Sequence, residues 1–360
     1  MQNYQSKALA DFTEPGRNSF NLVRLMAAAL VIVSHSFLIP YGLGSKEPLQ
    51  SLTSLTLGQH AVHVFFVISG LTLSRSITLK PSMALYARAR LLRIVPALIG
   101  FGLFFAFVMG PLATSVTLGL YFSDPNTWLY PLSVPINFQQ AATPPLVFQK
   151  APIPGAINNP LWTIKYEIFA YLSLGIFAAV GALRKTRYSI AALIVTALFS
   201  IVLQPYQDEN GLGALFQTAK FSFCFLLGVV LYLLRKSVPL NPIWLLFTLF
   251  LVVLVSQSPA ALLAFIVLDA HIAIVVGSSN FGWLTLWTQQ NDISYGTYIY
   301  GWPIQQFAIT VFPALGAFGL GTMSMFAALG LGYLSWKAIE QPALRLKRAE
   351  ITAGGKRKSL

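Results

Sequence analysis

Two ionisable residues lie inside the first strongly apolar stretch of the chain, NLVRLMAAALVIVSHSF, from Asn21 to Phe37. Arg24 and His35 are 11 residues apart, which on an α-helix places them within about 20° of one face and roughly 16 Å apart along the axis. An ionisable group inside a membrane span costs about 3 kcal/mol and usually faces the bundle interior. His35 is therefore a candidate general base, with a hydrogen-bonded core histidine as the simpler alternative. Arg24 fits either a substrate-binding cation or an anchor at the cytoplasmic edge.

A second polar group opens a later apolar stretch, INNPLWTIKYEIFAY. Asn159 is expected to cap a helix, Pro160 to take its first position and Trp162 to lie at the outer membrane interface. Lys165 and Glu167 then lie roughly 7 and 10 Å below the outer surface. At that depth the carboxylate can orient an imidazole, and the ammonium can stabilise an oxyanion. A structural ion pair without chemistry is the alternative.

A third group, ARARLLRIVP, carries Arg90 and Arg93 three residues apart, so the two guanidinium groups are neighbours on one helical face. Guanidinium groups bind phosphate in a bidentate geometry, which suits a phosphate-bearing substrate at a cytoplasmic mouth. Ordinary anchoring of a helix end by positive charge explains the pair equally well.

Other polar residues in apolar stretches give weaker signals. His63, in QHAVHVFFVISG, either lines the same cavity as His35 or lies at the interface, and Gly70 at the end of that motif predicts close helix packing. Asp269, His271 and Lys220 have no partner that the sequence identifies. No set of Cys and His residues has metal-ligand spacing, and there is no glycine-rich phosphate loop or serine nucleophile elbow, so we expect no metal site.

The composition identifies the kind of protein that must position these residues. Of 360 residues, 56% are hydrophobic and only 10% are charged, which excludes an ordinary soluble domain. The net charge of +13 does not require nucleic acid, because the basic residues cluster after every second apolar segment, as expected of cytoplasmic loops. A single cysteine, Cys224, excludes an intramolecular disulfide.

The apolar segments predict an all-α, polytopic bundle of about ten transmembrane helices with both termini in the cytoplasm. They lie near 20–40, 61–79, 91–110, 160–180, 188–204, 214–234, 242–256, 260–277, 292–312 and 316–338. The expected organisation is a cytoplasmic segment at 1–19, a transmembrane domain at 20–340 with an external loop at 111–159, and a basic cytoplasmic tail at 341–360. The SQSP sequence at 256–259 is either a tight turn between two spans or a break within one long segment.

Several short motifs together resemble the membrane-bound acyltransferase 3 family. Singly each is weak, but they follow the family's order over almost the whole chain. They are Arg24 with His35, VFFVISG at 64–70, Arg90 with Arg93 and Pro96, NNPLWTIKYEIFAYL, ISYGTYIYGWP, and IEQPALRL at 339–346.

The resemblance implies an enzyme of the inner membrane of bacteria that transfers an acyl group, acetyl by default, from acyl-CoA to a hydroxyl of a carbohydrate such as exopolysaccharide or lipopolysaccharide. It implies that His35 is the catalytic base supported by Arg24, that Arg90 and Arg93 serve the coenzyme A side, and that Trp162 and Glu167 belong to the site. Three positions depart from the family pattern: His63 replaces an acidic residue, Lys165 a frequent proline, and Gly301 a common histidine. These departures bear on the acceptor chemistry.

The main alternative is a transporter or flippase, because intramembrane His, Glu and Lys residues also form proton relays. The sequence contains no repeated halves and no paired broken helices, which disfavours this class. A purely structural subunit leaves the intramembrane ionisable residues unexplained.

Overall fold

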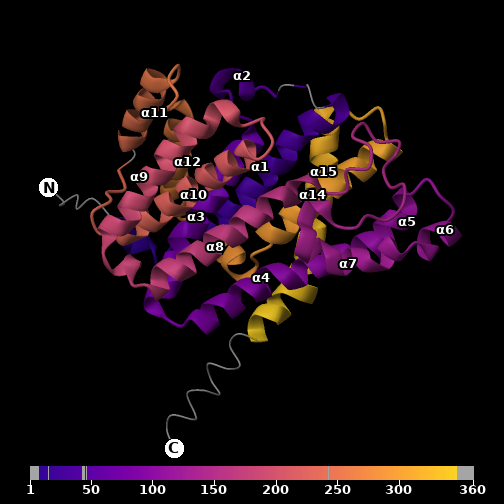
Figure 1. Cartoon of the computed structure of the whole chain (residues 1–360), viewed down its shortest axis with the longest axis horizontal. Helices are drawn as coiled ribbons and strands as arrows, with labels where there is room; N and C mark the ends of the chain where they lie inside the picture. The colour runs from indigo at the N-terminus through magenta and orange to yellow at the C-terminus, as the bar shows by residue number, and fades with distance from the viewer. Residues whose placement is uncertain (1–7, 15, 43–44, 46, 242, 347–360) are drawn as a thin grey trace, which may run out of the picture. The chain divides into compact units, whose positions relative to one another are not determined.

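A computed structural model describes residues 8–14, 16–42, 45, 47–241 and 243–346 (Figure 1). Those residues fold into helices and connecting segments, and the β-structure among them is limited to two isolated bridges. The expectations for 1–7 and for the tail from 347 onward lie outside the described residues. The expected all-α class is confirmed.

Each of the ten predicted apolar segments contains a helix, and shorter helices form in the connections. The helices are α1 (Phe20–Tyr41), α2 (Gln50–Thr53), α3 (Leu57–Leu79), α4 (Met83–Phe104), α5 (Gly110–Ala113), α6 (Leu118–Ser123), α7 (Pro125–Asn137), α8 (Ile164–Ala179), α9 (Thr186–Leu203), α10 (Leu212–Leu233), α11 (Ile243–Val255), α12 (Ala261–Gly277), α13 (Trp283–Gln290), α14 (Ser294–Val311) and α15 (Ala317–Ser335). The SQSP sequence is a turn between α11 and α12, so 242–277 forms two helices.

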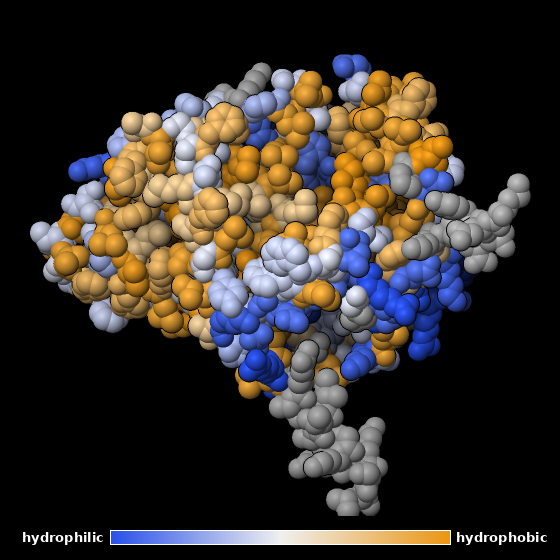
Figure 2. Space-filling model, turned by 180° about the vertical axis from the view of Figure 1, so that it is seen from behind, coloured by the Kyte–Doolittle hydropathy of each residue, from blue (hydrophilic) through white to orange (hydrophobic). Residues whose placement is uncertain are grey.

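Six helical segments of the described chain are long and apolar enough to cross a membrane. They are α1, α3, the run from α4 through α5, α9 with the turn after it, α10, and α15 with the turns after it. Helix α11, at 13 residues, is about 20 Å long, which is shorter than the roughly 30 Å hydrocarbon core. Hydrophobic side chains cover much of the face shown in Figure 2, as expected where lipid replaces water. The chain is a multi-pass membrane protein.

The described residues divide into two compact units. Unit 1 comprises Met1–Ala27, Gln59–Met83 and Tyr166–Gln290, and unit 2 comprises Ala28–Gly58, Ala84–Lys165 and Asn291–Leu360. The division falls inside α1 and inside α8, so each of these helices contributes to both units.

The core of unit 1 joins the start of α1 to α3, α10 and α12. Its buried side chains are Leu9, Phe20, Val23, Ile68, Leu71, Tyr232, Ala273 and Ile274. The first turn of α1 is tied to this unit by Ser19, whose hydroxyl donates to the Ser279 carbonyl at 2.6 Å, and by Asn21, whose amide donates to the Thr288 carbonyl at 3.1 Å. The position of Arg24 in unit 1 is fixed by these contacts.

Two glycines allow α3 and α10 to approach backbone to backbone. A Cβ atom at Gly70 would overlap the carbonyl oxygen of Phe225, and one at Gly228 would overlap that of Val67. Small residues at such crossings let membrane helices pack closely where there is no hydrophobic driving force between them. The prediction of close packing from the VFFVISG motif is confirmed.

Leucine in place of Gly228 is expected to separate α3 from α10 and to lower the free energy of unfolding by about 3 kcal/mol, because the clash is with backbone that cannot rotate away. Thermal unfolding of the purified protein in detergent measures the change. Gly330→Leu is the matched control, since Gly330 is an exposed glycine of α15 with open space at its Cβ position. Equal melting temperatures for the two variants would contradict the role given to this crossing.

In unit 2, helices α14 and α15 pack against each other at a second glycine contact (Figure 1). A Cβ at Gly296 would lie 2.9 Å from the Cα of Gly332. The buried residues Ile39, Trp302, Ala308, Ile309 and Leu320 form a core cluster that joins the end of α1 to both helices. This core holds the half of α1 that carries His35.

The expected external segment at 111–159 contains the short helices α5, α6 and α7 and a 3-10 turn at Phe138–Gln140, and most of the remainder is irregular. Between α4 and α5, residues Phe105–Met109 form a π-helical turn, and the Tyr121 hydroxyl donates to the Ala106 carbonyl at 3.0 Å. Burial raises the pKa of Tyr121, so it remains a donor at neutral pH. Helix α7 exposes Trp128, Leu132 and Ile136, which are apolar side chains suited to a membrane interface.

Candidate active site

His35 is partly buried in unit 2, where its ring meets the indole of Trp302 edge-on with 4.9 Å between the ring centroids. Trp302 itself is 1% exposed and its Nε1 donates to the Ala156 carbonyl at 2.9 Å. The indole is therefore held by the segment at 111–159, and it packs against one side of the imidazole. Sequence reasoning used the ISYGTYIYGWP motif only for the family resemblance and missed this contact.

The helix that carries His35 is attached to α14 along the same face. The Gln305 amide donates to the Ile32 carbonyl at 2.7 Å, and a Cβ at Gly301 would lie 2.8 Å from the Ile32 side chain. Gly301, where the family often has histidine, thus gives α1 room to lie close to α14. A larger residue at this position would push against the turn that precedes His35.

The segment that leads into α8 is pinned to α14 by hydrogen bonds within unit 2. The Asn158 amide donates to the Ile299 carbonyl at 2.8 Å, and the hydroxyls of Thr163 and Tyr298 are 2.8 Å apart. Residues Asn159–Thr163 form a 3-10 turn ahead of α8. The prediction that Asn159 is the cap is wrong, because the residue at the cap position of this turn is Asn158. The side-chain amide of Asn158 donates to α14 and does not cap the turn.

The expected site residues of this segment fall on both sides of the unit boundary. Asn159 accepts a hydrogen bond from the Gln139 amide at 3.1 Å, Trp162 is partly buried, and Lys165 is exposed; all three belong to unit 2. Glu167 belongs to unit 1, where it accepts a hydrogen bond from the Tyr171 hydroxyl one turn further along α8. His35 lies in unit 2, so its pairing with Glu167 stays a prediction. The support of His35 by Arg24, a partly buried residue of unit 1, also stays a prediction.

Arg93 lies at the centre of a buried ionic network in unit 2. Its guanidinium is 2.9 Å from the Asp292 carboxylate and 3.2 Å from that of Glu340. It also lies 5.6 Å from the centroid of the Tyr295 ring and 5.8 Å from that of Trp336. This network joins α4 to the residues before α14 and to the π-helical turn Trp336–Glu340 that follows α15.

Arg90 lies three residues before Arg93 on the continuous helix α4, so the predicted shared face is confirmed. Arg90 is partly exposed, whereas the Arg93 side chain is 8% exposed and its charge is offset by two carboxylates. Arg90 is therefore the more accessible of the two guanidinium groups. Glu340, a carboxylate partner of Arg93, is the acidic residue of the IEQPALRL motif. That motif is the part of the sequence that could have pointed to the pair.

His63 is buried in unit 1, at 1% exposure, and its Nδ1 lies 3.0 Å from the Asp269 carboxylate. His60, one turn earlier on α3, places its Nδ1 2.8 Å from the same carboxylate. Sequence reasoning left Asp269 without a partner because more than 200 residues separate it from both histidines. His271, two residues further along, instead lies 3.2 Å from the Thr248 hydroxyl of α11.

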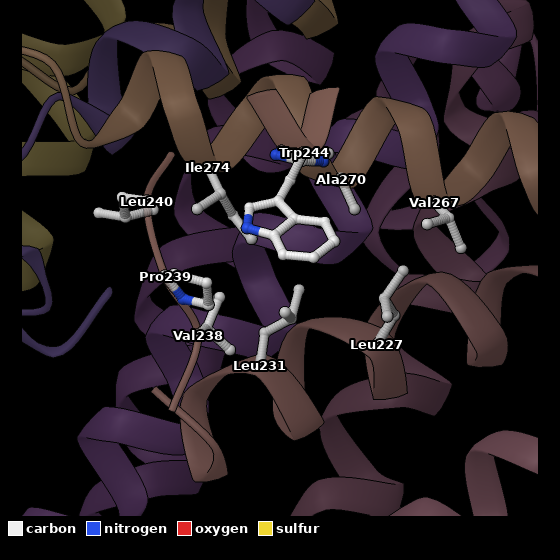
Figure 3. Close-up of a pocket in the computed structure, with 10 residues that line it drawn as sticks. Leu227, Leu231, Val238, Pro239, Leu240, Trp244, Val267, Ala270 and Ile274 are labelled. Atoms are coloured by element: carbon white, nitrogen blue, oxygen red, sulfur yellow. The ribbon is translucent and has the colours of Figure 1, made fainter. Parts of the chain in front are cut away.

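Two cavities of unit 1 are lined mostly by apolar side chains. One of about 360 Å³ is lined by α10, α11 and α12, with the Trp244 indole facing Leu231 and Ile274 (Figure 3). Another of about 420 Å³ lies between α8, α9 and α10 and is lined mainly by apolar side chains such as Phe169 and Phe199. Such mainly apolar linings suit acyl chains of lipid, and the first cavity also includes His271.

A partly buried histidine that packs against an aromatic ring inside a helical bundle is placed where it can act as a general base. A family model described as an acyltransferase domain matches residues 17–337. The chain therefore belongs to the acyltransferase 3 family.

Two curated relatives align with nearly the full chain. One is an "O-acetyl transferase" of Shigella phage Sf6, 26% identical over 90% of this chain and 95% of the relative. The other is "Nodulation protein 10" of Rhizobium leguminosarum bv. viciae, 28% identical over 93% of this chain and 95% of the relative. No solved structure matches the chain.

Proposed function

We propose that this membrane acyltransferase moves an acetyl group from cytoplasmic acetyl-CoA to a carbohydrate hydroxyl at or beyond the outer face of a bacterial inner membrane. The observation that carries the proposal is His35, a histidine held by Trp302 inside a member of a family of acyltransferases. The relative named as an O-acetyl transferase supports transfer to oxygen. Exopolysaccharide and lipopolysaccharide are the acceptor classes that we propose.

The proposed chemistry uses His35 as a single base. The neutral imidazole takes the proton of the acceptor hydroxyl while the hydroxyl oxygen attacks the thioester carbonyl. The new C–O bond forms, the C–S bond breaks, and the proton passes from the imidazole to the departing thiolate. Glu167 is proposed to orient the imidazole, and Lys165 to stabilise the oxyanion.

The remaining expected residues divide between the two substrates. Arg90 is proposed to bind a phosphate of the donor, while Arg93 supports the same face of α4 through its ion pairs. Arg24 is proposed to support the histidine from the same helix. His63, Trp162 and Asn159 are proposed on the acceptor side, since they lie at the ends of helices expected to face outward.

Transfer of label tests the function directly. Membranes that contain the protein, supplied with acetyl-labelled acetyl-CoA and surface glycan from a strain lacking the gene, are expected to produce label in the glycan that mild base releases, as an O-ester requires. Membranes without the protein are the control. Glycan that crosses the membrane unmodified in a protein-dependent way would identify a transporter instead.

Lysine in place of Arg90 is expected to raise the KM for acetyl-CoA about tenfold, which corresponds to roughly 1.4 kcal/mol, because an ammonium retains the charge but loses the bidentate contact with phosphate. Initial rates over a series of acetyl-CoA concentrations measure the change. Arg88→Lys, two residues earlier on α4, is the matched control. An unchanged KM for Arg90→Lys would show that Arg90 only anchors the helix end and does not bind the donor.

A further inference from the structure

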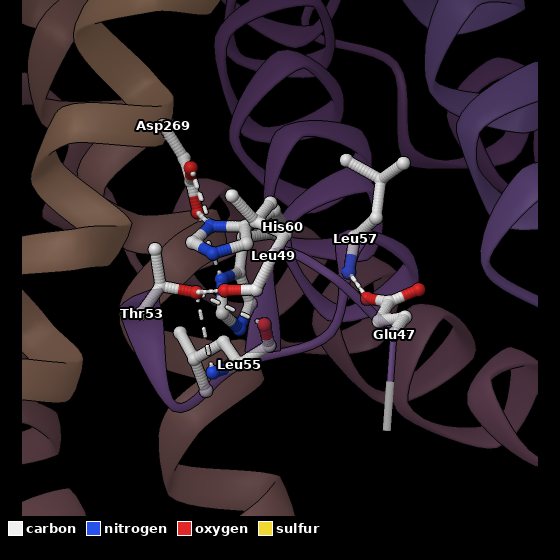
Figure 4. A network of polar contacts seen from close by, with 8 residues as sticks. Glu47, Leu49, Thr53, Leu55, Leu57, His60 and Asp269 are labelled. Carbon is white, nitrogen blue, oxygen red and sulfur yellow. Dashed lines mark hydrogen bonds and ion pairs between the residues drawn. The ribbon is translucent and has the colours of Figure 1, made fainter. Parts of the chain in front are cut away.

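His60 and Asp269 have no part in the proposed reaction, and their neighbour His63, which is proposed on the acceptor side, takes no part in its bond-making or proton-transfer steps. His60 and His63 are one turn apart on α3, and Asp269 lies in the middle of α12, all within unit 1. Figure 4 shows the Asp269 carboxylate directed at the His60 ring. The contact distances from the two Nδ1 atoms to the carboxylate oxygens are 2.8 to 3.0 Å.

The three side chains are enclosed. His60 is 12% exposed, His63 is 1% exposed and Asp269 is 8% exposed. A carboxylate withdrawn from water needs strong compensation, which two imidazoles or a cation can supply. The three potential ligand atoms, one from each residue, lie within 4.8 Å of one another.

Two imidazoles and one carboxylate are a ligand set with a definite preference among metal ions. Imidazole nitrogen suits zinc and the neighbouring transition metals, whereas magnesium and calcium prefer oxygen ligands. Three protein ligands with a fourth position for water are the arrangement of many zinc sites. A spacing of three residues on one helix lets both histidines approach a single ion.

Lys220 is the cation on α10 that opposes such a site. It interacts electrostatically with His63, and its ammonium lies 4.6 Å from the centroid of the Phe221 ring and 5.3 Å from that of Phe216. The faces of these two aromatic rings attract the ammonium and partly stabilise its positive charge. The ammonium would still repel a divalent ion, so it provides a sensitive test of whether one binds.

We propose that His60, His63 and Asp269 form a binding site for a divalent transition-metal ion of the Zn²⁺ class, which joins α3 to α12 inside unit 1. The histidine spacing alone gave no such indication, because the third ligand comes from a distant helix. The three residues do not include the proposed base, His35, and the occupancy of the site can be measured without activity.

The test uses the full chain, purified in detergent with a tag that lacks histidine, stripped with chelator and titrated with Zn²⁺. We expect one tightly bound Zn²⁺ per chain by elemental analysis after gel filtration, and at least a tenfold loss of affinity in His63→Gln and in Asp269→Asn. His271→Gln is the matched control and is expected to bind as the wild type does, because His271 lies on α12 outside the cluster. Lys220→Met is expected to bind Zn²⁺ more tightly, since a repelling charge is removed.

Three results would overturn the proposal. The first is a wild-type protein that retains no more Zn²⁺ than the His63→Gln and Asp269→Asn variants. The second is equal loss of binding in His271→Gln. The third is sulfur scattering in the zinc X-ray absorption spectrum, which would assign the ion to the buried Cys224. In the proposed site, only nitrogen and oxygen ligands at about 2.0–2.2 Å are expected.

Discussion

Glutamine in place of His35 is expected to lower the rate of acetyl transfer by about 10²- to 10⁴-fold, the range that a positioned general base contributes. Glutamine keeps a planar polar group against the Trp302 edge, so the packing of α1 on α14 changes little. The protein should therefore reach the membrane in normal amounts. Initial rates of label transfer, normalised to the quantity of folded protein, measure the effect.

His271→Gln is the control for His35→Gln, because it removes a partly buried histidine whose ring contacts Thr248 in unit 1. Its rate is expected to equal that of the wild type. A His35→Gln protein that transfers acetyl as fast as the wild type would remove His35 from the mechanism while leaving the family assignment intact.

An acyl-histidine intermediate is the alternative route that uses the same residue. Rapid quenching after mixing with labelled acetyl-CoA, in the absence of acceptor, separates the two routes. With direct transfer the protein is expected to retain no label, whereas a relay leaves label on a peptide that contains His35. Together with the rate of His35→Gln, the result separates a general base from a nucleophile.

Methionine in place of Arg93 is expected to lower the free energy of unfolding by about 3–5 kcal/mol, the cost of breaking a buried ion pair from one side. The variant leaves the carboxylates of Asp292 and Glu340 facing each other without the cation between them. The chain segments that this network joins are far apart in sequence, so the loss should affect the whole of unit 2. Thermal unfolding in detergent and the amount of protein in membranes measure it.

A double-mutant cycle with Glu340→Gln separates the ion pair from other effects of the arginine. The double variant should lose less stability than the two single variants lose together. Once Arg93 is replaced, Glu340→Gln removes a buried carboxylate that has no cation beside it. Arg88→Met is the control, since Arg88 is partly exposed and donates to the backbone carbonyl of Leu346 at 3.4 Å. Simple additivity of Arg93→Met and Glu340→Gln would show that the two side chains do not act on each other.

Helix positions were largely predictable because lipid imposes one rule on every span. A backbone without water must bond to itself, so a long apolar run becomes a helix whatever it packs against. This is why α1 extends unbroken past both Arg24 and His35, whereas the SQSP sequence at 256–259 left two interpretations open that only the structure decided in favour of a turn between α11 and α12. The first turn of α8 was less predictable, since Asn158 is held by Ile299 of α14 rather than by its own helix.

The candidate site was predictable only in its single-helix parts. The common face of Arg90 and Arg93 follows from helical geometry, and α4 confirms it. The partners of Arg93 do not follow, because Glu340 lies 247 residues away and local spacing contains no information about it. The same reason hid the contact of Trp302 with His35 and the meeting of Asp269 with His60 and His63.

The sequence by itself therefore determined a multi-pass helical membrane protein of the acyltransferase 3 family, together with the residues too polar for lipid. Apolar run length and motif order are local properties, and they suffice for those conclusions. Only the tertiary structure decided which polar residues meet: Arg93 with Asp292 and Glu340, His35 with Trp302, and Asp269 with two histidines. The physical reason is that a buried charge can be compensated from any helix of the bundle, and packing alone selects which helix supplies the partner.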